Sequence, residues 1–244
     1  MIYFISFATD ENYKKLSDDV LGGLNKIYPN SELRVFSKED LTPEIIEYCE
    51  KYKHGYGYFI WKPFLISNIV NDIPEGDIVF YIDGRTGLTN KNIFKIRNKL
   101  FKISWINKFL NSEKFDLVAW KMSHNIEETW TTGDLLSLLN VMDNKEITNS
   151  GQFSATFFGI RVSDKTKTFV KDWYDIMSNN LDFSRDEPSL SNNSKSFIQN
   201  RYDQSFLSIL IKQNFLNLNI LELTNDEIFN KQTLIPHMKK HPTK

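Results

Sequence analysis

The sequence predicts an α/β fold in which a mixed, mostly parallel central sheet is flanked by helices. Apolar runs of strand length alternate with longer segments whose apolar residues recur at helical spacing. In addition, the apolar run over 76–84 ends on a single carboxylate, Asp83, followed by a glycine. Such a strand delivers its carboxylate to the carboxyl edge of the sheet, where open α/β sheets bind ligands.

The first part of the chain gives the clearest alternation. Thr9 and Asp10 are good helix caps, and Thr42 followed by Pro43 is a good helix start. The predicted elements are, in order, a strand over 2–8, a helix carrying Tyr13, Leu16, Val20, Leu24 and Ile27 on one face, a strand over 33–36, a helix over 42–50, a helix from Pro63 and a strand over 77–83.

Beyond residue 87 the pattern is less regular. The polar segment 178–196 is rich in Asn and Ser, and we predict a loop there. The other predicted elements are a basic amphipathic stretch over 92–109, a strand over 115–120, a helix over 133–141, a strand over 152–162, a helix from Asp164, a helix over 203–213 and a strand over 216–223.

Composition narrows the class of protein. The length of 244 residues suits one α/β domain, and a net charge of −1 gives no electrostatic footprint for nucleic acid. Cys49 is the only cysteine, which excludes an intramolecular disulfide and favours a reducing compartment. The apolar run at the N-terminus is too short for a signal peptide or a membrane span. We therefore expect a cytoplasmic protein without an integral membrane segment, with peripheral recruitment to a membrane as an option.

Several common catalytic motifs are absent from the sequence. Ser6 to Asp10 stands where a dinucleotide-binding protein carries its glycine-rich turn, and no P-loop pattern occurs, which disfavours dehydrogenases and P-loop kinases. His237 and His241 are four residues apart, but prolines bracket them, so a helical metal site is disfavoured. There is no Gly-x-Ser-x-Gly elbow.

An aromatic and glycine-rich segment, 55–61, leads into the helix that we predict from Pro63. Lys62 then lies beside the free N–H groups of that helix, where a cation is unfavourable unless an anion neutralises it. A phosphate would resolve this conflict. The two residues fit a simpler interpretation as well, in which Lys62 extends into solvent and Trp61 fills the core.

The remaining candidates for chemistry are carboxylates and amides at predicted strand and helix ends. They are Asp83, Asp203, Gln204 and Gln152, with Lys62, Arg85 and Arg201 as possible phosphate partners. A hard cation shared with substrate phosphates needs few protein carboxylates. Taken alone, Asp203 is better explained as a helix cap.

Three segments, 57–63, 76–84 and 201–205, together resemble the ordered landmarks of GT-A-fold nucleotide-sugar glycosyltransferases associated with bacterial and viral surface polysaccharides. The resemblance covers most of the chain. It implies a Rossmann-like sheet, a nucleotide-binding half (1–90), a sugar and acceptor half (91–235) and a basic tail (236–244). It also implies a nucleoside-diphosphate sugar donor and a glycan, lipid-linked or protein-linked acceptor.

The resemblance implies roles for particular residues. Asp83 would hold a divalent metal, Mn²⁺ or Mg²⁺, with His237 as a second ligand; the usual Asp-x-Asp motif reads Asp83-Gly84-Arg85 here, so Arg85 could neutralise phosphate instead. Asp203 and Gln204 would contact the donor sugar, and Gln152 the sugar or acceptor. The residues implied for nucleotide and phosphate binding are Ser6, Ala8, Thr9, Tyr58, Trp61, Lys62 and Arg85.

The implied reaction is glycosyl transfer through an oxocarbenium-like transition state. An inverting enzyme also needs a base, for which Asp203, Glu127 or Glu128 could serve. Two alternatives stay open. A sugar-phosphate nucleotidyltransferase usually carries a glycine-rich, basic loop after its first strand, which residues 9–11 lack. A non-catalytic carbohydrate-binding protein on the same fold would explain the missing second carboxylate.

Overall fold

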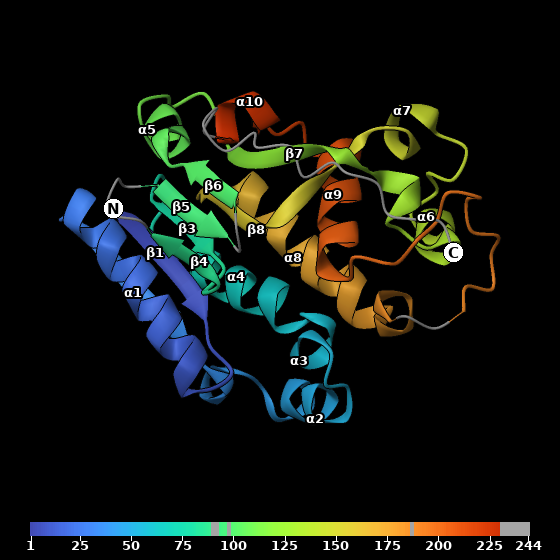
Figure 1. Cartoon of the computed structure of the whole chain (residues 1–244), viewed down its shortest axis with the longest axis horizontal. Helices are drawn as coiled ribbons and strands as arrows, with labels where there is room; N and C mark the ends of the chain where they lie inside the picture. Colours follow the sequence, from blue (N-terminus) through green and yellow to red (C-terminus); the bar gives the residue numbers. More distant parts are fainter. Residues whose placement is uncertain (89–92, 97–98, 186–187, 230–244) are drawn as a thin grey trace.

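A six-stranded sheet with the strand order β2-β1-β3-β8-β7-β9 runs through the computed structural model, which describes residues 1–88, 93–96, 99–185 and 188–229 (Figure 1). Strand β8 is antiparallel to β3 and β7, whereas the other neighbouring pairs are parallel. The predicted α/β class with a mixed, mostly parallel sheet is thus confirmed. The six strands are β1 (Ile2–Phe7), β2 (Ser31–Phe36), β3 (Ile78–Ile82), β7 (Leu117–Ile126), β8 (Gly151–Arg161) and β9 (Ile220–Leu223).

Helices cover both faces of this sheet (Figure 1). A separate antiparallel sheet consists of β4 (Thr86–Leu88), β5 (Ile93–Ile96) and β6 (Lys99–Lys102). The helices are α1 (Glu11–Ile27), α2 (Pro43–Lys51), α3 (Gly55–Tyr58), α4 (Trp61–Asp72), α5 (Ser104–Leu110), α6 (Gly133–Leu138), α7 (Lys145–Thr148), α8 (Asp164–Asn179), α9 (Asp203–Gln213) and α10 (Asn225–Ile228), with 3-10 turns at Lys38–Asp40, Glu127–Thr129 and Leu181–Ser184.

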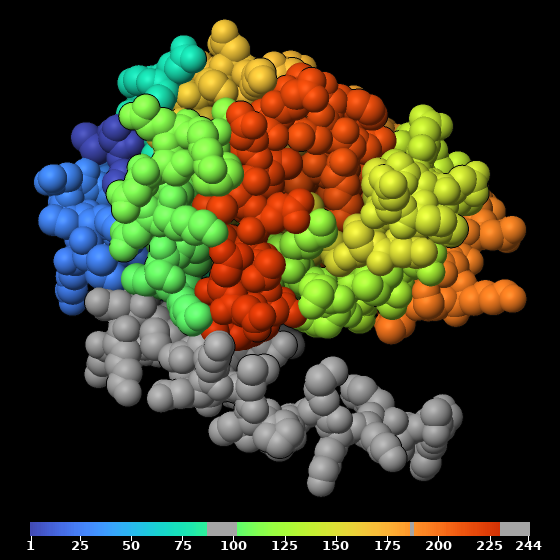
Figure 2. All heavy atoms as spheres, turned by 90° about the horizontal axis from the view of Figure 1, so that it is seen from above, coloured from blue at the N-terminus to red at the C-terminus, as the bar shows by residue number. Residues whose placement is uncertain are grey.

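The alternation of side chains along β1 separates two apolar cores. Phe4 packs with α1, α5 and α10 on one face, whereas Tyr3 and Ile5 pack with α4, α8 and α9 on the other. Trp173 of α8 is fully buried in the second core. On the surface shown in Figure 2, the C-terminal described residues lie between the segment around α5 and the segment around α7. Both faces of the sheet are covered, which explains why its strands read as nearly continuous apolar runs.

The capping residues in the sequence correctly predicted where α1 and α2 begin. Asp10 accepts hydrogen bonds from the backbone N–H groups of Asn12 and Tyr13, and Thr42 caps α2. The helix predicted from Pro63 instead begins two residues earlier, at Trp61. Proline is tolerated there because N–H groups of the first helical turn have no intrahelical partner.

Other boundaries differ from the predictions. Strand β7 continues to Ile126, six residues beyond the predicted end. The basic stretch 92–109 contains β5, β6 and α5, a mixture for which the sequence carried no clear period. The predicted basic tail, 236–244, lies outside the described residues, and the division of the chain at residue 90 stays a prediction. Among the described helices, none is long and apolar enough to cross a membrane.

Two glycines provide a matched test of this packing. A Cβ on Gly159 of β8 would lie 2.5 Å from the Phe80 ring and 2.8 Å from Val118, whereas one on Gly22 of α1 would meet nothing within 4 Å. We expect Gly159→Ala to lower the free energy of unfolding by about 1–3 kcal/mol, because the core has no room. Gly22→Ala should raise it by about 0.5–1 kcal/mol through helix propensity.

Urea unfolding followed by circular dichroism measures both changes. Equal effects of the two substitutions would contradict the close contact between β8 and the Phe80 ring.

Candidate functional site

A cavity of about 560 Å³ opens at the carboxyl ends of β1 and β3, and we call it the strand-end cavity. The chain reaches it in three places: the end of β1 with the start of α1, the segment 53–61, and the residues after β3. Its lining consists of Phe7, Thr9, Tyr13, Lys53, His54, Gly55, Tyr56, Phe59, Trp61, Asp83 and Arg85. This is the edge at which the sequence predicted a ligand site.

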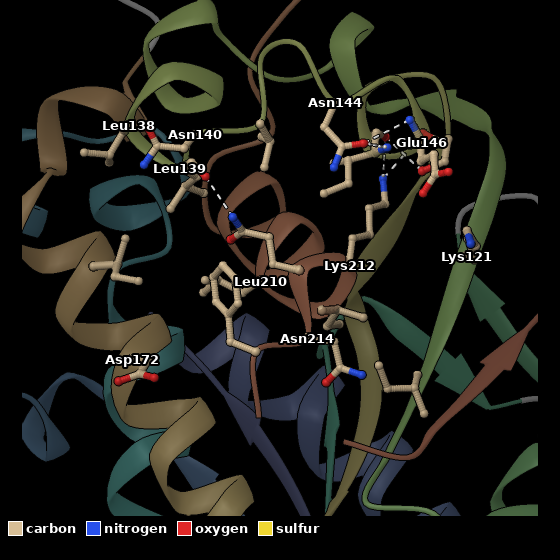
Figure 3. A pocket seen from close by; sticks show the side chains of 18 of the residues that line it. Lys121, Leu138, Leu139, Asn140, Asn144, Glu146, Asp172, Leu210, Lys212 and Asn214 are labelled. Atoms are coloured by element: carbon tan, nitrogen blue, oxygen red, sulfur yellow. Dashed lines mark hydrogen bonds between the residues drawn. The ribbon is translucent and has the colours of Figure 1, made fainter. Parts of the chain in front are cut away.

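A larger cavity of about 750 Å³ lies elsewhere, among α6, α7, α8, α9 and β9 (Figure 3). Its lining mixes apolar side chains such as Leu138 and Leu210 with polar ones such as Asn144 and Lys212. Among the described residues, none of the site residues predicted from the sequence lines it. We therefore take the strand-end cavity as the candidate site despite its smaller volume.

Asp83 and Arg85 are fixed at the cavity by a tight turn. The Asp83 backbone N–H donates to the Thr156 carbonyl at 2.9 Å, and the Arg85 N–H donates to Asp83 Oδ1 at 3.2 Å. Gly84 between them has no room for a side chain, since a Cβ would lie 2.3 Å from Ser17 Oγ of α1. The turn therefore presents a carboxylate and a guanidinium side by side.

The Arg85 guanidinium is itself held in place. Its Nε donates to the Tyr13 hydroxyl at 2.8 Å, and its carbon lies 5.1 Å from the centre of the Tyr13 ring. A guanidinium with one side occupied by a tyrosine keeps other N–H donors for a second acceptor. Arg85 is exposed at the cavity, so such an acceptor can come from a ligand.

The wall formed by α3 is a left-handed turn. Five consecutive residues have φ values between 51° and 75°: Gly55, Tyr56, Gly57, Tyr58 and Phe59. Only glycine adopts this region without penalty, and the other residues cost about 1–2 kcal/mol each. Strain of this kind persists where the surrounding structure enforces it, and it clusters at functional sites.

Contacts with neighbouring elements enforce the turn. The Gly57 N–H donates to the Tyr52 carbonyl at 2.7 Å, and the Trp61 indole N–H donates to the Gly55 carbonyl at 3.1 Å. Gly57 is required by packing as well, because a Cβ there would lie 2.5 Å from Cys49 Sγ. The turn is therefore anchored on α2 at one side and on α4 at the other.

Aromatic side chains in and next to this turn form a cluster of ring contacts. The His54 ring lies 4.5 Å from the Tyr202 ring and 5.6 Å from the Tyr58 ring, measured between centroids. Trp61 stacks on Phe7 at 4.0 Å and is buried. Tyr202 itself has a positive φ of 54° at the start of α9. Residues of the two chain halves thus meet beside the cavity.

Lys62 points away from solvent into this cluster. Its ammonium nitrogen lies 2.6 Å from Asp203 Oδ2 and donates to the Ala155 carbonyl at 3.1 Å. The rings of Phe59 and Tyr81 both lie 5.1 Å from the nitrogen. The anion that neutralises Lys62 at the start of α4 is therefore the Asp203 carboxylate, and the phosphate expected from the sequence has no access to it.

Asp203 is buried, and a second carboxylate, that of Asp83, acts on it electrostatically. Burial raises the pKa of the Asp203 carboxyl, while the Lys62 ammonium opposes this effect and the negative charge of Asp83 adds to it. Asp83 lines the strand-end cavity, so Asp203 lies within electrostatic reach of it. The charge of Asp83 at the end of β3 therefore affects the carboxyl group of Asp203 at the start of α9.

Gln152 and Gln204 form the next part of the interior. Gln204 Nε2 donates to Gln152 Oε1 at 2.8 Å, and Gln152 Nε2 donates to Glu127 Oε1 at 2.8 Å. Gln152 and Glu127 are completely buried, whereas Gln204 is partly exposed. The structure thus brings Lys62, Asp203, Gln204 and Gln152 together along β8, behind the cavity rather than in its lining.

The other predicted residues are dispersed. Ser6 is buried, with its hydroxyl 3.0 Å from Ser17 Oγ, and Ala8 is buried with its N–H bonded to the Phe36 carbonyl. Thr9 and Trp61 line the cavity, and Tyr58 stacks on His54 next to it. Arg201 lies with its guanidinium carbon 4.0 Å from the centre of the Trp130 ring, and His237 lies outside the described residues.

Several lining residues were missed by the sequence analysis, and two of them, Lys53 and His54, are basic. Lys53 and His54 stand directly before the glycine-rich turn and are exposed at the cavity. Their position immediately before Gly55 was the available signal, because a turn that lines a site brings its flanking residues with it. With Arg85, they give the lining of the cavity three basic side chains and one carboxylate, Asp83.

The described residues do not by themselves form a protein-held metal site. Asp83 is the carboxylate that lines the cavity, and no group of three or more His, Cys, Asp or Glu side chains among the described residues could hold a metal ion. A guanidinium stands where the second carboxylate of an Asp-x-Asp motif would stand. We therefore assign no step to a metal ion.

No protein-family profile and no curated protein matches this chain. A glycosyltransferase involved in the glycosylation of the major capsid of PBCV-1 is 10% identical, with 91% of this chain and 81% of that chain covered and a TM-score of 0.47. A Bacillus anthracis protein described as a candidate glucose-1-phosphate thymidylyltransferase is 9% identical, with 91% and 87% covered and a TM-score of 0.39. At these TM-scores neither likeness bears on the chemistry of this chain.

Removing one partner of the Lys62–Asp203 pair should be costly. We expect Lys62→Met to lower the free energy of unfolding at neutral pH by about 3–5 kcal/mol, because it leaves a buried, unpaired carboxylate. The double variant Lys62→Met/Asp203→Asn should recover much of this loss. Urea unfolding of both variants gives the double-mutant comparison.

The pH dependence gives the same pair a second test. In Lys62→Met the pKa of Asp203 rises further above its unfolded value of about 3.9, so folding takes up a proton between the two values. The difference in free energy of unfolding between wild type and Lys62→Met should then increase as the pH rises from about 4 to about 7. A gap that does not change with pH would show that Asp203 is not the group left unpaired.

Proposed function

We propose that this protein is a glycosyltransferase on a GT-A-like sheet, moving a sugar from a nucleoside-diphosphate sugar to a hydroxyl of a glycan or glycoconjugate. The observation that carries the proposal is the strand-end cavity, where Asp83 and Arg85 stand side by side at the carboxyl ends of β1 and β3. Ligands bind at this edge of open α/β sheets. The cavity volume of about 560 Å³ suits a nucleotide-sized ligand.

The charge of the cavity supports an anionic ligand. Arg85 and Lys53 provide fixed positive charge, and His54 adds a nitrogen donor. Departure of a nucleoside diphosphate needs such stabilisation, because negative charge builds on the leaving oxygen. We propose that Arg85 binds the diphosphate directly and so replaces part of what a metal ion supplies in related chemistry.

The aromatic rings in the lining favour a ligand that contains a nucleoside. Phe7, Tyr56, Phe59 and Trp61 supply aromatic surface next to the charged residues. Aromatic faces stack well on bases and on sugars. We place the nucleoside against these rings and the diphosphate toward Arg85.

For the sugar end we propose Gln204, the partly exposed neighbour of Asp203. Asp203 is buried against Lys62, so its contribution is to hold the start of α9, from which Gln204 projects. Glu127 is excluded as an acceptor base, because its two oxygens already accept four hydrogen bonds in the interior. Glu128, which is partly exposed, is the remaining candidate for an inverting reaction.

A ligand screen tests the proposal as a whole. Wild-type protein would be examined by thermal shift and calorimetry with UDP, GDP, UDP-glucose and GDP-mannose, each with Mn²⁺ and with EDTA. We expect one nucleotide series to stabilise the protein, since a ligand bound only by the folded state raises its stability. Slow hydrolysis of the matching sugar nucleotide is expected as well.

Other outcomes discriminate among the alternatives. Tight binding only of nucleoside triphosphates would favour a nucleotidyltransferase. Binding of free glycans without any nucleotide would favour a carbohydrate-binding protein. Binding that requires Mn²⁺ and is lost in Asp83→Ala would restore the metal role that the resemblance implies for Asp83.

Arg85 gives the sharpest single-residue prediction. Arg85→Ala should weaken binding of the nucleoside diphosphate by about tenfold or more, since a hydrogen bond between charged groups contributes about 1.5–3 kcal/mol. Calorimetric titration of UDP and GDP measures the change.

The matched control is Arg34→Ala, which alters a partly exposed arginine of β2 whose guanidinium carbon also lies near a tyrosine ring, that of Tyr3, at 5.4 Å. It should leave the affinity unchanged. Equal affinities of wild type and Arg85→Ala, with a folded variant, would remove Arg85 from the binding site.

A further inference from the structure

Glu127 is a completely buried carboxylate that the proposed reaction does not use. Four side chains donate to it. Thr131 Oγ1 and Gln152 Nε2 reach Oε1 at 2.7 and 2.8 Å, and Ser208 Oγ and Lys212 Nζ reach Oε2. Its hydrogen-bonding capacity is therefore filled entirely from within the protein.

Lys212 reaches this carboxylate from the wall of the larger cavity. In Figure 3 its side chain leaves α9 and points toward the segment that carries Asn144 and Glu146. The Lys212 nitrogen also lies 3.5 Å from the carbonyl oxygens of Ile147 and Ser150, and the side chain is 5% exposed. The negative charge of Glu127 is thus balanced at the same depth.

The carboxylate dictates the orientation of two amides. A carboxylate only accepts hydrogen bonds, so Gln152 must turn its NH₂ group toward Glu127 and its Oε1 away from it. That Oε1 accepts from Gln204 Nε2 at 2.8 Å. Gln204 Oε1 then faces the Ala155 N–H at 3.4 Å. The Trp130 carbonyl, 3.3 Å from Gln152 Nε2, and the Ala155 N–H favour the same orientation, so a neutral group in place of Glu127 would weaken the preference for this orientation of both amides.

We propose that Glu127 is a positioning residue whose negative charge fixes, through Gln152, the orientation in which the Gln204 amide meets the donor sugar. This inference rests on the proposed function, because it gives a purpose to the orientation of Gln204. Glu127 itself touches no substrate. Its effect on the reaction passes through the chain of hydrogen bonds Glu127, Gln152, Gln204.

A contribution to folding stability does not by itself explain the buried ion pair between Glu127 and Lys212. Replacing a buried ion pair by apolar residues of similar volume is often neutral or stabilising. A buried carboxylate with a fixed set of donors does, however, specify one arrangement of its neighbours. The arrangement that it specifies here ends on the amide next to Asp203.

The decisive variant is the charge-neutral pair Glu127→Gln/Lys212→Met, which removes both charges together. We expect the side-chain NH₂ resonances of Gln204, assigned by their loss in Gln204→Met, to shift in ¹⁵N spectra. Hydrolysis of UDP-glucose or GDP-mannose should slow by roughly 10- to 100-fold, as expected when a reacting group is misplaced. Affinity for UDP and GDP should stay within about twofold, because the residues that line the strand-end cavity are unchanged.

Thr131→Val is the matched control. It removes one donor from Glu127 and one acceptor, at 3.1 Å, from Gln152 Nε2, but leaves the negative charge that orients Gln152. We expect Gln204 resonances close to those of wild type and a hydrolysis rate within about threefold of wild type. An equally large loss of rate in this variant would overturn the proposal in favour of a general packing role. Unchanged Gln204 resonances in the charge-neutral pair would overturn it as well.

Two further comparisons keep the test decisive. If the charge-neutral pair does not fold, Gln152→Met cuts the same chain while leaving Glu127 and Lys212 paired, and the same shift and loss of rate are expected. If wild type neither binds nor hydrolyses any sugar nucleotide, the proposed function fails. The Gln204 resonances then still decide whether Glu127 orients the amide.

Discussion

The buried pair between Lys62 and Asp203 is the interaction on which the site depends. It joins the first turn of α4 to the first residue of α9, and it does so over the backbone of β8, where Lys62 also reaches the Ala155 carbonyl. A pair at this depth contributes little net stability, but either charge alone would be costly. The pair therefore fixes the starts of α4 and α9 relative to each other and to the sheet. The residues that flank these helix starts are positioned by the same interaction.

The left-handed turn beside this pair depends on it. Phe59, the last residue of the run with positive φ, lies with its ring 5.1 Å from the Lys62 nitrogen, and Tyr202 packs on His54 and Tyr58 from the other side. Local preference opposes this backbone, so it must be maintained by tertiary contacts. The wall of the cavity is thus shaped by the interior behind it, and the exposed residues contribute the charge.

Strand ends and helix caps were predictable because their signals are local. The placement of Asp83 after β3 and the span of α9 both followed from patterns within a dozen residues. The partner of Lys62 was not predictable, since Asp203 is 141 residues away in sequence. The same holds for Glu127, whose donors come from three separate segments. Tyr58 and Phe59 adopt a left-handed conformation that residues with a side chain disfavour. The only sequence signal for this turn was the pair of glycines, Gly55 and Gly57.

The position of β8 in the sheet has a consequence for synthesis on the ribosome. Phe80 of β3 pairs with Gly159 of β8, about 80 residues later in the chain. At about 5–20 residues per second, β3 would wait roughly 4 to 16 seconds for its second neighbour. During that interval five consecutive apolar residues, Ile78–Ile82, form an open sheet edge in the nascent chain. Until β8 arrives, this edge of β3 is open to pairing with other strands.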